Sequence, residues 1–347
     1  MRFRMTLYRK ILLLLPLATL YILTGCYAPR YTEVEILFPA EKDIPDEINK
    51  VAMVNRSYLP LEERKKSGIY YENNQFKREK VYQDSIVSDN ALYSFAYHVN
   101  VAPRLTVAEK DSIIRKNIDE YQFLEPMKPD KVSKICKETG ADAVVALEAF
   151  HSFDSLDYYT SGFEVIGVRA TSLFTLWRTY FPKFKSPVDK LFDQDTVWFE
   201  GVGYSTYSAR KNLPSRKQAL QEASYQAGEK YAQQISPHYK TIERLYFEYY
   251  NKPMSRATDF ARDSQWKKAA AIWRKIAKEG SRTKHAIAAF NMAVASEMLG
   301  QLDLAGYWID EAIKKKSNAS IFNKYKATIA DRIKRQEVIN RQMNIND

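Results

Sequence analysis

The sequence is poor in several features on which common enzyme classes depend. Its 347 residues include 11 glycines and 4 histidines. It contains no glycine-rich phosphate loop, no Gly-x-Ser-x-Gly turn, no HExxH and no CxxC. These absences exclude the familiar motifs of nucleotide-binding enzymes, serine hydrolases, zinc proteases and thioredoxin-like proteins. We therefore predict that the protein is not an enzyme, and no small-molecule substrate can be identified.

Cysteine is almost absent, which excludes an intrachain disulfide. The two cysteines are Cys26 and Cys136, and Cys26 belongs to a processing motif described below, so that Cys136 has no partner. Val132, Ile135 and Cys136 share one face of a predicted helix. No histidine or positive helix end is indicated beside this thiol, and we predict that Cys136 is a small buried hydrophobic residue.

No apolar run is long enough to cross a membrane. The longest covers residues 11–23, behind a basic segment that holds Arg2, Arg4, Arg9 and Lys10. Thirteen helical residues reach only about 20 Å, whereas the hydrocarbon core of a bilayer is about 30 Å thick. A charged segment followed by a short apolar one is typical of an export signal. We predict that residues 1–25 are this signal and are removed.

The signal ends in Leu23, Thr24, Gly25 and Cys26. Small residues at positions 24 and 25 give a peptidase access to the backbone, and the thiol of Cys26 can accept a diacylglyceryl group. The four residues resemble the lipobox of bacterial lipoprotein precursors. The resemblance implies that acyl chains on Cys26 attach the mature chain to a membrane, with no cofactor besides this lipid. An ordinary secretory signal with a chance cysteine is the alternative.

The residues after Cys26 and the charge of the chain bear on location and partners. In known lipoproteins an aspartate directly after the cysteine marks retention in the inner membrane, and an acidic run can mark surface display. Residues 27–30 offer neither, so the resemblance implies the periplasmic face of the outer membrane. Four of the positive charges behind the net charge of +11 lie in the signal. The mature chain is therefore mildly basic, and we expect envelope protein partners and no nucleic acid.

Composition shifts divide the mature chain into regions. We predict a tether that becomes a strand at residues 26–46, an α/β domain at 47–240, a helical domain at 241–336 and a frayed polar tail at 337–347. Within the second region, strands are predicted at 51–57, 104–108 and 143–150, helices at 88–97 and 130–139, and an insertion or mobile loop at 61–86.

Two aromatic and β-branched stretches, residues 162–180 and 191–207, predict a long antiparallel hairpin, because the prolines between them are typical of a turn. A helix follows from Ser215 to the residues before Pro237, with alanines along one face that allow close packing on a sheet. The predicted fold class is thus α+β: a mixed α/β domain with a long hairpin, followed by an all-α domain.

The order of elements from residue 51 to residue 235 is similar to that of the periplasmic α/β domain shared by curli-secretion-type lipoproteins and the N-terminal domains of Tol-type proteins. Residues 51–57, the block at 137–150 and the helical tail together resemble a family of uncharacterised bacterial envelope lipoproteins. This resemblance covers most of the mature chain. It implies a fold and no activity.

The helical tail contains an internal repeat with an offset of 36 residues. This offset is close to the tetratricopeptide period of about 34 residues. Large and small residues at matching places predict tetratricopeptide-like helix packing, with a generic helical bundle as the alternative. The first copy has Trp266, Ala269 and Trp273, and the second has Leu302, Ala305 and Ile309. We expect residues 318–336 to form a capping helix and the first unit to pack on residues 246–250.

One constellation could carry chemistry. Glu148, His151, Asp154 and Asp157 follow one another where the predicted strand ends, and carboxylates with an imidazole could bind a metal or act as acid and base. On a regular strand, however, Glu148 and His151 point to opposite faces. A strand that continues into a polar loop explains the four residues better.

Three functions remain open. We favour a lipid-anchored, non-enzymatic envelope protein that acts as an interaction or assembly scaffold through its helical tail. The first alternative is an accessory or pore subunit of a secretion system, which the long hairpin at 162–207 suggests. The second is a metal-assisted hydrolase that uses residues 148–157.

Overall fold

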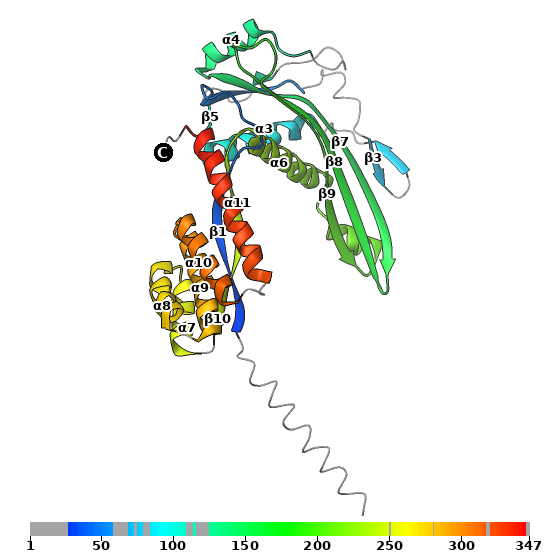
Figure 1. Ribbon diagram of the computed structural model, residues 1–347. Coiled ribbons are helices and arrows are strands. Elements are labelled where there is room, and N and C mark those ends of the chain that lie inside the picture. Colours follow the sequence, from blue (N-terminus) through cyan, green and yellow to red (C-terminus); the bar gives the residue numbers. More distant parts are fainter. Residues whose placement is uncertain are drawn as a thin grey trace, which may run out of the picture. The chain divides into compact units, whose positions relative to one another are not determined.

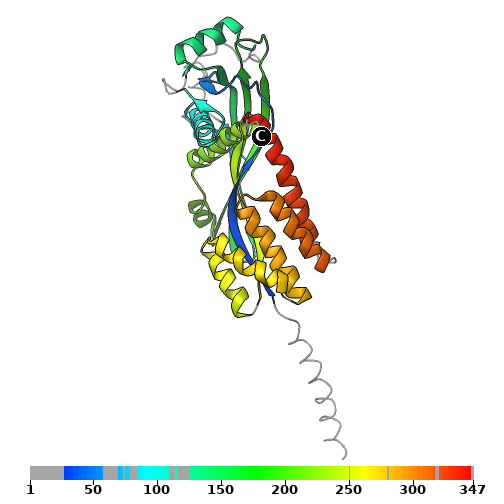
Figure 2. The same cartoon turned by 60° about the vertical axis from the view of Figure 1, so that its left-hand side comes forward.

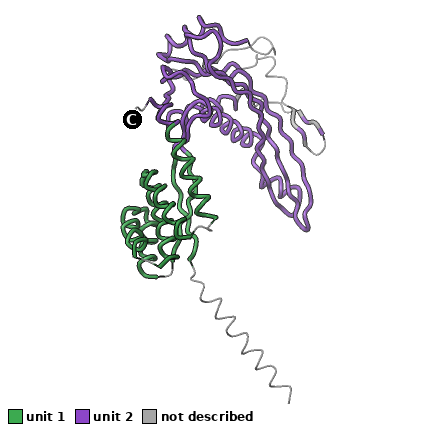
Figure 3. The backbone as a smooth tube through the Cα atoms, viewed as in Figure 1, with its two compact units in different colours: residues 1–36, 240–337 green, residues 37–239, 338–347 purple. Residues whose placement is uncertain are grey.

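The computed structural model describes residues 27–57, 69–72, 75–78, 84–108, 114–115, 125–249, 251–279, 281–316 and 320–344. They form two compact units (Figure 3). The helical unit comprises Lys240–Glu337 and the described residues up to Ile36, and the α/β unit comprises Leu37–Tyr239 and the residues from Val338. Strands with interspersed helices precede a run of helices (Figure 1), which confirms the predicted α+β class.

The centre of the α/β unit is a group of parallel strands. These are β2 (Lys50–Asn55), β5 (Thr106–Val107), β6 (Ile114–Arg115) and the first part of β7 (Ala143–Ser161). Helix α3 (Asp84–Val101) lies between β2 and β5 in the chain, and α4 (Pro129–Thr139) precedes β7. Gly140 ends α4 with a φ of 66°, a left-handed conformation that glycine adopts without strain. The predicted strands and helices occur in the predicted order, with β6 as an additional strand.

Three long antiparallel strands, which we call the meander, extend from this centre. They are β7, β8 (Glu164–Tyr180) and β9 (Asp189–Gly203). The predicted hairpin is present as β8 and β9, paired from Val165 opposite Gly203 to Thr179 opposite Asp189. The prediction that the first strand ends near residue 150 in a polar loop is wrong. β8 pairs with β7 as far as Ser161, and this backbone ladder keeps the polar residues in a strand.

Helices cover one face of the meander. α6 (Arg216–Ile235) and α3 lie on the same side of it (Figure 1), and their apolar side chains form one core with those of β7 and β8. The rings of Trp177 and Tyr231 stack there with centroids 4.9 Å apart. A Cβ atom on Gly228 of α6 would lie 2.0 Å from the carbonyl oxygen of Ala91 of α3. Only glycine therefore permits this approach of the two helices.

On the opposite face, α4 covers the end of the sheet where β2 and β7 pair. Val132 and Cys136 of α4 pack there with Val144 and Tyr180. Cys136 is buried as predicted, and burial together with the charge of Asp142 raises its pKa to about 11. Its thiol therefore stays protonated at neutral pH, which agrees with a packing role.

The described part of the predicted loop at 61–86 is ordered secondary structure. β3 (Ile69–Glu72) and β4 (Gln75–Arg78) form an antiparallel hairpin, and β3 also pairs in parallel with Ser155 and Leu156 of β7. The loop prediction is wrong for these residues. The error follows from the underestimated length of β7. β3 pairs with residues of β7 that were themselves predicted to be a loop.

The helical unit contains five helices among the residues that the structure describes. They are α7 (Lys252–Arg262), α8 (Trp266–Glu279), α9 (Arg282–Met298), α10 (Leu302–Lys315) and α11 (Ser320–Gln342), the last of which continues into the α/β unit. The repeat related by 36 residues corresponds to α8 and α10. Its buried positions are Trp266, Ala269, Trp273, Ala305 and Ile309, with Leu302 half-buried. The helical hairpins are thus present, and the tetratricopeptide assignment itself stays a prediction.

A two-stranded ribbon packs on these helices. It consists of β1 (Tyr27–Phe38) and β10 (His238–Tyr249), which lie alongside each other in Figure 2. Tyr246 and Phe247 of β10 belong to the core of the helical unit. This confirms the prediction that the helices pack on the segment beginning at residue 246.

The described chain opens with a strand rather than a tether. The strand predicted from residue 33 begins at Tyr27. Within it, Arg30 donates hydrogen bonds of 2.7 and 2.5 Å to the carboxylate of Glu248 in β10. The tether prediction fails from residue 27 because pairing with β10, distant in sequence, orders these residues.

The frayed tail predicted from residue 337 is also wrong as far as residue 342. α11 includes these residues, and Ile339 is buried. The side-chain amide of Gln342 accepts a hydrogen bond from the backbone N–H of Ala40 (2.8 Å) and donates one to its carbonyl oxygen (3.1 Å). The polar composition of the tail does not indicate this contact. A glutamine side chain can both donate and accept hydrogen bonds, and here it binds the backbone of a residue beyond the end of β1.

Candidate functional site

The lipobox, Leu23, Thr24, Gly25 and Cys26, lies outside the described residues. The first described residue is Tyr27, which opens β1. Among the described residues, no helix combines the length and the apolar character that crossing a bilayer requires. Attachment through the acyl chains of Cys26 stays a prediction.

Glu148 is a buried structural carboxylate. It occupies a β-bulge of β7, where the register with β8 shifts. It accepts hydrogen bonds from Arg56 (2.9 Å) and from the hydroxyl of Tyr180, and the guanidinium of Arg178 is 3.8 Å away. Burial raises the pKa of Glu148, although Arg56, Tyr180 and Arg178 act in the opposite direction. Burial and the neighbouring carboxylate raise the pKa of Tyr180 to about 12, so its hydroxyl remains a donor.

Asp154 is a second buried carboxylate with its own partners. Arg169 donates a hydrogen bond to one oxygen, and the hydroxyl of Thr171 donates to the other at 2.8 Å. The Nε atom of Arg216, in the first turn of α6, is 3.8 Å from the carboxylate. Burial raises the pKa of Asp154 against the influence of Arg169, Thr171 and Arg216.

The sheet separates these two carboxylates. Glu148 contacts Tyr180, which lies in the core under α4. Asp154 is bonded to Thr171, which has the same strand parity as Leu173 in the core under α6. His151 and Asp157 are exposed, and the bulge breaks the alternation expected between Glu148 and His151. The four candidates form no common site.

No group of three or more His, Cys, Asp or Glu residues that could hold a metal ion occurs in the described ranges. Both buried carboxylates have arginine partners, which occupy the oxygens that a cation would need. A hydrolase built on residues 148–157 therefore has no ligand set here.

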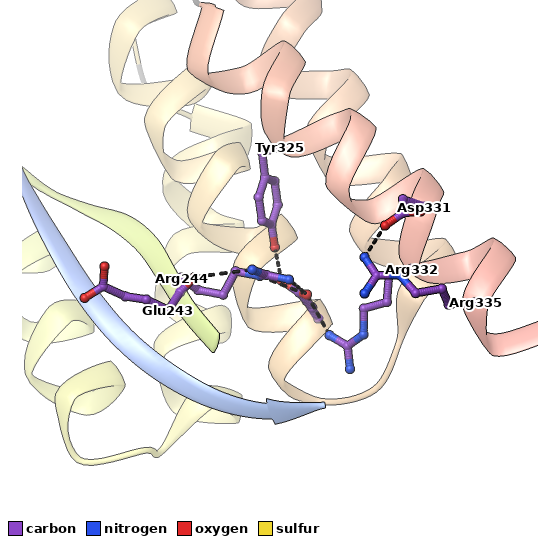
Figure 4. A network of polar contacts seen from close by, with 7 residues as sticks. Glu243, Arg244, Tyr325, Asp331, Arg332 and Arg335 are labelled. Atoms are coloured by element: carbon purple, nitrogen blue, oxygen red, sulfur yellow. Dashed lines mark hydrogen bonds and ion pairs between the residues drawn. The ribbon is translucent and has the colours of Figure 1, made fainter. Parts of the chain in front are cut away.

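The helical unit has a buried carboxylate of its own, Glu297 of α9. Arg244 of β10 donates to both of its oxygens at 2.8–3.0 Å, Tyr325 of α11 donates at 2.6 Å, and a nitrogen of Arg332 is 2.7 Å away. Figure 4 shows these three side chains converging. Burial by itself would raise the pKa of Glu297, but hydrogen bonds from Arg244 and Tyr325 and the nearby positive charges lower it. The network fastens β10 and α11 to α9.

β10 occupies the face of α9 on which we expected a partner peptide to bind. Asn291 accepts a hydrogen bond from the backbone N–H of Phe247 (2.8 Å) and donates one to its carbonyl oxygen (2.6 Å). The rings of Phe247 and Phe290 are 5.2 Å apart. A peptide would have to displace β10 to reach these residues.

The meander, in contrast, has one face that is covered only at its end, by α4. No described residue covers the rest of this face. Phe153, Tyr159, Phe192 and Trp198 are exposed by 41%, 49%, 64% and 66%. We call this surface the aromatic face and define it by these four side chains and the half-buried Phe174.

Strand register shows that the five side chains share this face. Residues directly opposite each other in neighbouring strands point to the same side. The rows across β7, β8 and β9 are Ala149–Leu176–Phe192, His151–Phe174–Gln194, Phe153–Ser172–Thr196, Ser155–Ala170–Trp198, Asp157–Val168–Glu200 and Tyr159–Ile166–Val202. Leu173 and Thr171, at the intervening positions of β8, point to the side covered by α6. His151 and Asp157, two of the predicted site residues, thus belong to the open surface.

Sequence reasoning missed this surface, although β9 carried a signal. Apolar residues occupy both parities of the strand: Phe192 and Trp198 on one side, and Leu191, Val197 and Phe199 on the other. A strand with one buried face normally alternates apolar and polar residues. Apolar residues on both parities require either a second covering layer within the chain or a partner.

A shallow groove lies on the outer side of α3 and α6. Its volume is about 590 Å³, and Tyr93, Tyr97 and Tyr225 line it with amide side chains. Tyr97 is exposed, and it lies outside the aromatic face. It therefore serves below as a matched aromatic control.

Two family models match the chain. Residues 48–247, from just before β2 into β10, match the model described as a domain of unknown function, DUF8603. The chain belongs to this family. Residues 255–335, within the helical unit, match a second domain of unknown function, DUF6340. No curated protein matches the chain.

Two solved structures show a distant likeness to part of the chain. The PelC dodecamer from Paraburkholderia phytofirmans has 10% identity and a TM-score of 0.20, and the match covers 59% of this chain and 98% of that one. The hypothetical protein CT253 from Chlamydia trachomatis has 10% identity and a TM-score of 0.22, with 53% of this chain and 96% of that one covered. At these TM-scores we draw nothing from them about fold or function.

Proposed function

We propose that this protein is a lipid-anchored, non-enzymatic component of the cell envelope that docks a protein partner on the aromatic face. The observation that carries the proposal is the open apolar surface of the meander. Acyl chains on Cys26 would hold the chain at the periplasmic side of the outer membrane. The protein would thus act as a membrane-attached assembly scaffold, with the meander rather than the helical tail as its binding surface.

The chemistry of the aromatic face favours a protein as the partner. The centres of protein interfaces are enriched in Trp, Tyr and Phe and depleted of charge. The six rows of the face contain these aromatics, neutral side chains such as Ser172 and Thr196, and few charged groups. They contain no Lys or Arg, and the adjoining row adds only one exposed basic residue, Lys190, beside the buried Arg178, whereas an anionic polymer or lipid headgroup would require a cluster of them.

The geometry points the same way. A small molecule needs a concave pocket that covers most of its surface, whereas a sheet face is broad and shallow. A large exposed apolar surface on a folded domain usually marks an interaction site. Burying one aromatic side chain removes about 150–250 Å² from water, and a few such residues dominate a typical interface. Trp198 and Phe153 are the candidates for this role.

A double substitution tests the proposed surface. Trp198→Ser with Phe153→Ser should abolish recovery of protein partners from crosslinked envelopes, while the protein stays folded and membrane-bound. The control is Tyr97→Ser, which removes an aromatic side chain outside the face whose exposure, 59%, lies between those of Phe153 and Trp198, and which should leave recovery unchanged. Equal recovery with the double variant and with wild type would refute the docking role.

The anchor is tested separately. Cys26→Ser should abolish labelling by fatty acids and release the chain from the membrane fraction. A variant that remains in that fraction at its normal mobility, or a wild-type chain without fatty-acid label, would contradict the lipid attachment. The result does not depend on what the aromatic face binds.

A further inference from the structure

The outer edge of β9 has no strand beside it in the described structure. β9 pairs with β8 alone. Near the end of β9, the side chain of Asn212 donates a hydrogen bond of 2.7 Å to the carbonyl oxygen of Val202. Residues 189–201 precede this cap. An edge of this length presents backbone N–H and C=O groups that can pair with another strand.

We propose that a second copy of this chain pairs with this edge, β9 antiparallel to β9, about a two-fold axis at Asp195. The two meanders then form one continuous sheet. This proposal goes beyond the docking function above because it uses the edge of β9, whereas the docking function uses the aromatic face. Each is therefore tested by its own substitutions.

The charges of β9 select this register. In an antiparallel pair of two β9 strands, the residues that face each other have the same parity, because only alternate residues direct their N–H and C=O groups to the free edge. Lys190 is the single basic residue of β9, and Glu200 is its single acid at an even position. They oppose each other only when Asp195 lies on the axis. The symmetry then creates this pair twice.

Both members of the pair are available for it. Lys190 and Glu200 are exposed, and neither has an ion-pair partner within the described chain. A shift of the register by two residues would place Lys190 opposite Trp198 or opposite Val202 and would leave both charges without partners. Opposite charges directly across a sheet stabilise pairing, and like charges destabilise it.

The apolar residues of β9 fit the same register. Phe192 of each copy lies opposite Trp198 of the other, and Leu191 lies opposite Phe199. Phe192 and Trp198 are the most exposed side chains of the aromatic face within one copy. Cross-strand aromatic pairs stabilise sheets, and pairing would cover part of both rings. An isologous interface of this kind is the commonest form of self-association.

Two features oppose the pairing. The backbone N–H of Thr196 already donates a hydrogen bond of 2.8 Å to the carboxylate of Asp195, which pairing would have to replace, and Asp195 faces Asp195 on the axis. Lys230 of α6 compensates for this: its Nζ atom lies 3.3 Å from Asp195 and 2.6 Å from Asp193. Each copy carries its own Lys230, so two lysines accompany the aspartates. Acidic residues on an edge strand can also serve to prevent pairing. The same experiment distinguishes this reading.

A charge exchange provides the test. Sedimentation equilibrium of the full mature chain with Cys26→Ser, which removes association through lipid, should show a monomer–dimer equilibrium. Lys190→Glu and Glu200→Lys should each weaken the dimer by about tenfold or more, since each creates two like-charge pairs. The double variant should restore the original affinity. Lys217→Glu, on an exposed position of α6, is the control and should change nothing.

Three results would overturn the proposal. They are a wild-type chain that stays monomeric at every concentration, a double variant that remains as weak as the single ones, and a closed ring of more than two copies. A ring would instead favour the head-to-tail arrangement of a pore subunit. Trp198 also faces Phe192 across the paired edges, so recovery of a partner through the aromatic face is scored here with Phe153→Ser, which lies on β7 away from that edge. Failure of one proposal then leaves the other intact.

Discussion

The ribbon of β1 and β10 and the meander of β7, β8 and β9 are both built from strands rich in aromatic residues, yet their aromatic side chains have different environments. Phe247 of the ribbon is 5% exposed and lies 5.2 Å from the rings of both Phe290 and Tyr27. Trp198 of the meander is 66% exposed. The helices that follow the ribbon pack on its aromatic residues, whereas α6 returns to one face of the meander only. The covering layer, rather than the strand sequence, decides which aromatic residues are core.

The buried carboxylates of the two units differ in a related way. Glu297 receives hydrogen bonds from Arg244 and Tyr325 that outweigh the effect of burial, and its pKa is lowered. Asp154 and Glu148 also have arginine partners, but burial prevails and their pKa values are raised. Proximity of an arginine is therefore insufficient, and the number and geometry of the hydrogen bonds decide the sign.

The largest difference in the free energy of unfolding is expected between truncation of an aromatic residue in the ribbon and truncation of one in the meander. Phe247→Ala should lower the free energy of unfolding by about 3–5 kcal/mol, because it removes a buried ring from the core of the helical unit. Trp198→Ala should change it by less than about 0.5 kcal/mol, because the ring is exposed. Chemical denaturation of both variants measures this. Similar losses would show that the aromatic face is covered within the chain.

A smaller loss is expected when the carboxylate of the helical unit is neutralised. Glu297→Gln should cost about 3 kcal/mol, since it leaves Arg244 and Arg332 buried without their counter-charge. Asp259→Asn, which breaks an exposed pair with Arg262, is the control and should cost under about 0.5 kcal/mol. Equal effects in denaturation would mean that the network contributes no more than a surface ion pair.

The effect on stability of replacing a glycine by alanine is expected to differ between α6, which covers the meander, and α10 of the helical unit. Gly228→Ala should destabilise the protein by about 1–3 kcal/mol, because the new Cβ meets the backbone oxygen of Ala91. Gly306→Ala in α10 has no neighbour within 4 Å and should stabilise by up to about 1 kcal/mol. Thermal unfolding of both variants gives the two signs. A neutral Gly228→Ala would refute the close approach of α3 and α6.

The smallest effect is the opposite pH dependence of the two kinds of carboxylate. The pKa of Glu297 is lower in the folded state than in the unfolded state, where it is near 4.3. Glu297 therefore stabilises the fold fully above this unfolded-state pKa, and the stabilisation is lost as pH falls through the folded-state pKa. The raised pKa of Asp154 makes its contribution largest at low pH and lost as pH rises through the folded value. The cost of Glu297→Gln should thus grow between pH 4 and pH 7, while that of Asp154→Asn should shrink. Denaturation at both pH values measures the trends, and parallel trends would contradict the assignment.

Local signals in the sequence predicted local structure well. The helix expected from Ser215 is α6, with Ser215 as its N-cap, and it ends before Pro237 as expected. Gly140 ends α4 in the conformation that its position indicated. These features depend on a few neighbouring residues, whose conformational preferences are strong.

Features that depend on distant segments were not accessible in this way. Residues 148–157 were expected to run from a strand into a loop with a possible site, but they lie in one strand with a bulge at Glu148. Arginines from distant segments bind Glu148 and Asp154, which are therefore structural. Gln342 found its partner at Ala40, some 300 residues away. The sequence of β9 indicates two apolar sides, but it does not specify which of them a helix covers and which forms the open aromatic face.

The most direct test of the central claim uses Trp198 as a probe. All five tryptophans lie in the described residues, and only Trp198 is exposed. Its rate of chemical modification can be measured in the purified chain and in intact envelopes, both with Lys190→Glu to remove pairing between copies. Docking on the aromatic face predicts rapid modification in the purified chain and strong protection in the envelope. Equal rates in the two settings would contradict it.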